Sequence, residues 1–134
     1  MDKRIQIWNI LHDGEITVFE QKDETLIMFI NIPYLRRRLK PLGDSFVLTL
    51  SGLKQVCFLD FDGNTLSLSE ELDINLPVIL STHSGVMPLS IITTKGTLVL
   101  DFKSISFALD TGQTISFEAI EKACEQYWEE WEYK

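Results

Sequence analysis

The chain has 134 residues, of which 45% are hydrophobic and 24% charged. This balance is typical of one globular domain and argues against a disordered chain. Twelve Lys and Arg against twenty Asp and Glu give a formal net charge of −8. Such a charge disfavours sequence-independent binding to nucleic acid or to an anionic membrane, because both need a positive surface. We therefore expect a single domain, residues 1–134, with neither nucleic acid nor membrane as its partner.

The opening segment, residues 1–13, does not have the uninterrupted apolar run of an export signal, because Gln6 and Asn9 interrupt it. No stretch reaches the ~20 apolar residues of a membrane-spanning helix. Cys57 and Cys124 both lie in apolar contexts, so we expect small buried side chains and no disulfide between them. These features predict a cytoplasmic protein.

Strands are predicted where β-branched and aromatic residues alternate with polar ones between turn residues. The expected strands are residues 15–20, 25–32, 44–51, 53–61, 65–68, 89–94, 97–109 and 114–117. A bulge or bend is expected near 103–104 within the longest of them. Residues 70–88 contain three prolines or glycines that forbid one long element, and we expect a short strand or an irregular crossing there.

Two helices are predicted. Residues 4–12 form a short amphipathic helix, and a longer one follows Ser116 as N-cap. Its apolar residues recur with helical spacing as a single stripe: Ile120, Ala123, Cys124, Tyr127, Trp128 and Trp131. The fold class is therefore α+β: a mostly antiparallel sheet of seven or eight short strands, a C-terminal helix packed on it and a short N-terminal helix.

The basic residues concentrate in residues 36–40, which contain Arg36, Arg37, Arg38 and Lys40. Such a cluster can recognise phosphate or an acidic protein. We favour a solvated turn whose arginines pair with surface glutamates, since no glycine-rich phosphate loop is present.

Residues 58–66 resemble the first motif of the haloacid-dehalogenase-like phosphohydrolases. That resemblance implies Asp60 as nucleophile, Asp62 as acid/base and Mg²⁺ as cofactor. Asn64 interrupts the motif, however, and no helical crossover pattern follows. We interpret these residues as a hairpin turn.

The same residues match part of a calcium loop. Asp60, Asp62 and Asn64 occupy the first three ligand positions and Glu71 the last. Thr65 stands where that loop needs glycine, and strands rather than helices flank it. The histidines His12 and His83 belong to no nucleophilic or zinc motif. We therefore expect no catalytic residue, no metal and no cofactor.

Three segments, residues 8–16, 32–35 and 43–46, resemble small uncharacterised bacterial proteins that begin with a similar Leu-His-Asp-Gly turn. This resemblance implies a bacterial origin and a similar size. The acidic composition is also similar to that of immunity proteins of bacterial toxin systems, which block a toxin by surface complementarity.

The C-terminal segment has the least ordinary composition. Residues 127–133 contain two of the three tryptophans and two of the three tyrosines, and residues 118–134 contain six Glu and two Lys. Aromatic residues among acids are common in binding surfaces. We hypothesise a non-catalytic interaction domain that binds a basic protein, or associates with itself, through a surface of Glu125, Glu129, Glu132, Trp131 and Tyr133.

Two alternatives remain open. Trp128 and Trp131 can instead cover the sheet core, with Tyr133 alone exposed. The domain can also bind a small ligand on the apolar face of a curved sheet, which would suit its many Phe and Leu residues.

Overall fold

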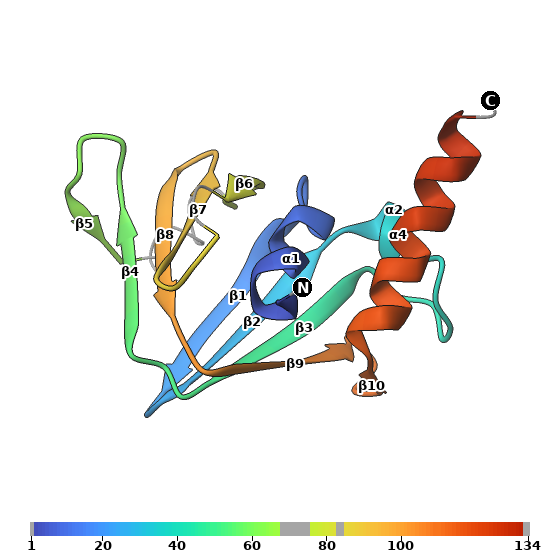
Figure 1. Ribbon diagram of the computed structural model, residues 1–134, viewed down its shortest axis with the longest axis horizontal. Coiled ribbons are helices and arrows are strands. Elements are labelled where there is room, and N and C mark those ends of the chain that lie inside the picture. Colours follow the sequence, from blue (N-terminus) through green and yellow to red (C-terminus); the bar gives the residue numbers. More distant parts are fainter. Residues whose placement is uncertain (1, 68–75, 83–84, 133–134) are drawn as a thin grey trace.

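The computed structural model describes residues 2–67, 76–82 and 85–132, and these form two antiparallel sheets with helices beside them (Figure 1). The α+β class is thus confirmed. The described helices are α1 (Lys3–Ile10), α2 (Pro33–Arg36) and α4 (Phe117–Glu132). Among the described residues, no helix is both long and apolar enough to cross a membrane.

The first sheet, sheet A, has the strand order β1-β2-β3-β9-β10. Its strands are β1 (Glu15–Lys22), β2 (Thr25–Asn31), β3 (Ser45–Ser51), β9 (Ser104–Leu109) and β10 (Thr114–Ile115). Sheet B has the order β5-β4-β8-β7-β6. Its strands are β4 (Gln55–Leu59), β5 (Thr65–Leu66), β6 (Ile79–Thr82), β7 (Leu89–Thr93) and β8 (Gly96–Asp101).

The described residues contain ten strands rather than seven or eight, partly because the segment 97–109 divides. Instead of one bent strand, it forms β8 in sheet B and β9 in sheet A. The chain crosses between the sheets at Phe102, which is buried, and Lys103. Arg4 Nη1 donates hydrogen bonds to the carbonyl oxygens of both residues, at 3.2 and 3.3 Å. The crossing therefore leaves these two carbonyls paired although they belong to neither sheet.

One hydrophobic core joins the two sheets and α1. The helix α1 lies near the middle of the molecule and contacts β6, β9 and α4 (Figure 1). Asp2 caps its first turn by accepting a hydrogen bond from the Arg4 backbone N–H at 2.9 Å. Trp8 is fully buried, and its indole N–H donates to the Arg4 carbonyl at 2.9 Å. The short N-terminal helix is thus part of the core rather than an appendage.

The interpretation of residues 36–40 as a solvated turn is wrong for Arg36, whose side chain is fully buried. Its Nε donates to the Ser45 carbonyl at 3.1 Å and to Asp110 Oδ1 at 3.0 Å. Its Nη2 is 2.8 Å from the same Oδ1 but lacks hydrogen-bond geometry, so it contributes charge attraction alone. The interpretation holds for Arg38, which pairs with Glu130 of α4.

Thr93, buried at the end of β7, supports the tight turn to β8. Its hydroxyl accepts from the N–H groups of Lys95 and Gly96 and donates to the Gly96 carbonyl at 2.8 Å.

Thr93→Val should lower the free energy of unfolding by about 1–2 kcal/mol, because buried N–H groups lose their acceptor. Urea denaturation measures this cost. Thr97→Val, on the outer face of the same hairpin, should change stability by less than about 0.5 kcal/mol; equal losses would contradict the assignment.

Candidate interaction surface and inter-sheet cavity

The first half of α4 is fixed to the domain. The Ser116 hydroxyl accepts from the Ala119 N–H at 3.2 Å, which confirms Ser116 as the N-cap. Phe117, Ile120 and Ala123 are buried, and the ring of Phe117 lies 6.0 Å from that of Phe107 in β9. This half of the helix therefore holds the other half in a defined direction.

The second half of α4 is fixed by Tyr34 of α2 and by two side chains that follow α2 and α1 in the chain, Arg38 and His12. The ring of Tyr127 lies 4.5 Å from that of Tyr34, and the Arg38 guanidinium lies 5.5 Å from the Tyr127 ring centre. The Trp128 ring stacks on His12, with ring centres 6.0 Å apart and planes within 10°. These contacts fix Trp128 while leaving much of the helix surface uncovered.

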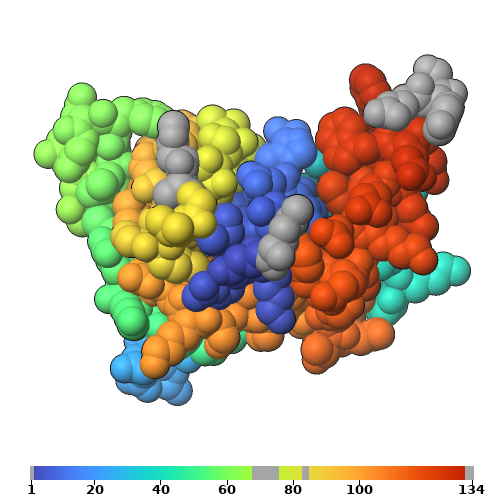
Figure 2. Space-filling view, viewed as in Figure 1, coloured from blue at the N-terminus to red at the C-terminus, as the bar shows by residue number. Residues whose placement is uncertain are grey.

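Trp131 has 61% of its surface exposed and Trp128 has 39%, and their ring centres are 6.4 Å apart. The alternative in which Trp131 covers the sheet core is therefore wrong. Glu125 and Glu129 are exposed on the same half of the helix, which stands open at one end of the molecule (Figure 2). We call these four residues the α4 surface. Glu132 lies in the last turn of α4, but its side chain and all of Tyr133 fall outside the described residues.

Five of the six acids of α4 follow one stripe, because they recur at helical spacing: Glu118, Glu121, Glu125, Glu129 and Glu132. The sixth, Glu130, pairs with Arg38. Acids four residues apart repel each other by about 0.2–0.5 kcal/mol per pair. The last turn contains no basic residue to balance the negative end of the helix dipole. The α4 surface therefore combines exposed indole rings with an unbalanced negative field.

Burial shifts two groups beside the α4 surface. It raises the pKa of the Cys124 thiol, an effect that a hydrogen bond with Trp128 partly opposes. It also raises the pKa of Tyr34 to about 12, with a smaller contribution from the negative charge of Asp13. At neutral pH both groups are uncharged, so neither adds to the negative charge of the glutamates.

The raised pKa of Tyr34 predicts a loss of stability at high pH. The neutral phenol is favoured in the fold, so its contribution is complete below pH 10 and is lost as pH rises towards about 12. Tyr34→Phe should lose less stability over this range than the unmodified chain, as measured by urea denaturation. Tyr127→Phe keeps Tyr34 and should retain most of the loss, because burial is the main cause of the shift. Identical pH profiles for all three proteins would contradict the assignment.

The aspartate motif forms the turn between β4 and β5, as expected. Asp60 Oδ1 accepts from the N–H groups of Asn64 and Asp62, at 2.8 and 2.9 Å, and these bonds lower the pKa of Asp60. Its carboxylate thus organises the loop. Glu71 and His83 lie outside the described residues. Within the described residues, no three or more metal-binding side chains form a group that could hold a metal ion.

His12 and the two cysteines complete the account of the candidate residues. His12 lies two residues after α1, with Nδ1 2.7 Å from the Asn9 carbonyl oxygen in the last turn of that helix, as a C-terminal cap would be. Cys57 and Cys124 are both free thiols, but they are half-buried rather than buried.

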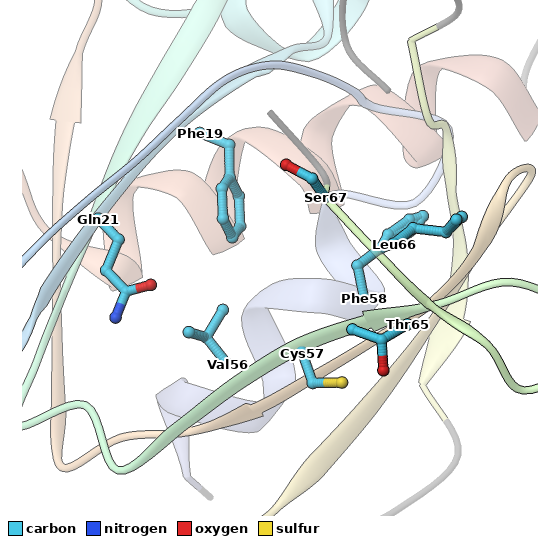
Figure 3. A pocket seen from close by; sticks show the side chains of 8 residues that line it. All are labelled: Phe19, Gln21, Val56, Cys57, Phe58, Thr65, Leu66 and Ser67. Carbon is cyan, nitrogen blue, oxygen red and sulfur yellow. The ribbon is translucent and has the colours of Figure 1, made fainter. Parts of the chain in front are cut away.

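A cavity of about 330 Å³ opens between the two sheets, at the opposite end of the molecule from α4 (Figures 1 and 3). We call it the inter-sheet cavity; its lining residues are Phe19, Gln21, Val56, Cys57, Phe58, Thr65, Leu66 and Ser67. Phe19 and Gln21 come from β1, and most of the others from β4 and β5. Apart from the apolar strands themselves, no pattern in the sequence indicates this cavity.

Comparison of the chain with protein-family models, curated proteins and solved structures finds no match. The class of protein is therefore defined by its geometry: an α+β domain of two antiparallel sheets with an exposed aromatic and acidic helix end.

Proposed function

We propose that this chain is a non-catalytic interaction domain that binds a basic protein through the α4 surface. The observation that carries the proposal is the exposure of Trp131 and Trp128 on a helix that also carries a stripe of glutamates, next to Trp128 and on the opposite side from Trp131. Large exposed aromatic rings supply most of the energy of many interfaces, and complementary charge supplies orientation and fast association.

The charges favour a basic partner over a second copy of the same chain. A two-fold dimer through the α4 surface would bring the two acidic stripes together, because both copies contribute the same patch. A basic surface would instead relieve the repulsion among Glu121, Glu125 and Glu129 and balance the helix dipole. An immunity-like inhibitor that covers a basic enzyme would be one form of this function. The two free cysteines suit the reducing cytoplasm expected of such a protein.

Selection of peptides from a random display library tests the proposal and requires no identified partner. The immobilised chain should enrich peptides rich in Arg and Lys with a few aromatic residues. The same selection against Trp131→Ala should not enrich them. Neutral or acidic consensus peptides, or equal enrichment by the variant, would overturn the proposal.

A further inference from the structure

The inter-sheet cavity lies where the inner faces of the two sheets separate. In the β1–β2 register Phe19 lies opposite Met28 and Gln21 opposite Leu26, and both partners are buried in the core. Phe19 and Gln21 therefore belong to the inner face of sheet A. Val56, Phe58 and Leu66 belong to the inner face of sheet B, since Phe58 pairs with Leu66 and side chains alternate along β4.

The close view agrees with this placement (Figure 3). The ring of Phe19, the amide of Gln21 and the side chain of Val56 face a common space, whereas Cys57 and Thr65 point to the other side of sheet B. The walls of the space thus combine apolar side chains of both sheets with uncharged polar groups, among them the side-chain amide of Gln21 and the hydroxyl of Ser67.

Its chemistry differs from that of the other large cavity. That cavity, of about 380 Å³, is lined by five charged side chains: Asp2, Arg4, Lys54, Asp101 and Lys103. Arg4 is already paired there with Asp2. Among the described residues, no charged side chain lines the inter-sheet cavity, although 24% of the chain is charged. A charged ligand would lose its hydration there without gaining an ion pair.

Size sets a second limit. The volume of about 330 Å³ admits a small molecule rather than a large one. Ligand pockets of proteins begin at about this volume and combine apolar walls with a few polar groups.

From these observations we propose that the inter-sheet cavity binds a small neutral amphipathic molecule, with its apolar part between Phe19 and Val56 and its polar group at Gln21. This site is independent of the α4 surface, which lies at the other end of the molecule (Figure 1).

Titration with 1-octanol, followed by amide NMR spectra, tests the proposal. Octanol should shift the amides of Phe19, Gln21, Val56 and Leu66 in a saturable way and leave Trp131 unchanged. Octanoate, which has the same chain and a negative charge, should bind at least about tenfold more weakly. Absence of saturable shifts, shifts spread through the whole core, or equal binding of octanoate would each overturn the proposal.

Two variants and a control sharpen the test. Val56→Trp should fill the cavity and abolish the shifts. Gln21→Leu replaces an exposed side chain, so it should leave the fold intact, and it should weaken octanol binding by about two- to tenfold through the lost hydrogen bond. Thr97→Val, on the outer face of sheet B and outside the cavity lining, should bind octanol like the unmodified chain. Unchanged binding by both Val56→Trp and Gln21→Leu would place the octanol elsewhere and overturn the proposal.

Discussion

Asp110→Asn should lower the free energy of unfolding by about 3 kcal/mol at pH 7, because it leaves the fully buried Arg36 guanidinium without its counter-charge. Burial alone would raise the pKa of Asp110, but hydrogen bonds from the Asp44 N–H, Arg36 and the Ser45 N–H outweigh it and lower that pKa. Asp110 thus supports the turn into β3 from two directions, through the guanidinium and through the backbone.

The pH dependence gives the same prediction an independent readout. A lowered pKa in the fold means that the ion pair contributes fully above the ordinary carboxyl pKa of about 4 and is lost as pH falls below it. The stability difference between the unmodified chain and Asp110→Asn should therefore narrow on acidification, measured by urea denaturation at pH 7 and pH 3. A constant difference would contradict a charge effect.

Two further variants separate the ion pair from general damage to this region. Asp44→Asn, whose carboxylate is 61% exposed and 3.9 Å from Arg37, should cost less than about 0.5 kcal/mol. Arg36→Met combined with Asp110→Asn should recover part of the loss, because the unpaired buried charge is removed. A double variant as unstable as the sum of both single variants would argue against coupling of the two residues.

Trp131→Ala should weaken binding of a basic peptide selected on the unmodified chain by about thirtyfold or more, the loss typical of a residue that dominates an interface. Its own fold should change by less than about 0.5 kcal/mol, because 61% of the side chain is exposed. Isothermal titration calorimetry measures the first effect and urea denaturation the second.

Phe61 provides a matched control for Trp131. It is 72% exposed in the turn between β4 and β5, far from α4 (Figure 1), and Phe61→Ala should bind the peptide unchanged. The double variant Glu125→Gln with Glu129→Gln should slow association of the basic peptide. This difference in association rate should shrink at high salt, because at 1 M salt charges are screened beyond about 3 Å. Equal losses for Trp131→Ala and Phe61→Ala would indicate non-specific adhesion.

The local elements were predictable where one physical signal dominated. Alternation and the polar turn at residues 21–24 predict the β1–β2 hairpin, which the structure closes at the pair Lys22 and Thr25. The apolar stripe with Ser116 as N-cap predicts α4. Trp131 follows the core-facing stripe in sequence but lies beyond the last elements that could cover it. Periodicity gives the direction of a side chain along a helix but not where the rest of the domain ends, so the exposure of Trp131 needed the structure.

Three features depended on tertiary pairing and left no local trace. The same alternation suits a single strand or two strands in different sheets, so the crossing at Phe102 was missed. The burial of Arg36 depends on Asp110, which is 74 residues away. A register shift between Ile16 and Val18 turns Phe19 and Gln21 to the inner face, against the alternation expected from Ile16. The inter-sheet cavity follows from that shift and could not be read from the strand pattern.

The most direct test of the proposed function is the response of the tryptophan indole N–H signals in an NMR titration with the selected basic peptide. The three indoles report from different places: Trp8 is buried and bonded to the Arg4 carbonyl, Trp128 is partly exposed, and Trp131 is the most exposed. Binding at the α4 surface should shift Trp131 most and Trp128 next, and leave Trp8 unchanged. A saturable titration in which neither Trp131 nor Trp128 shifts would contradict the proposed function.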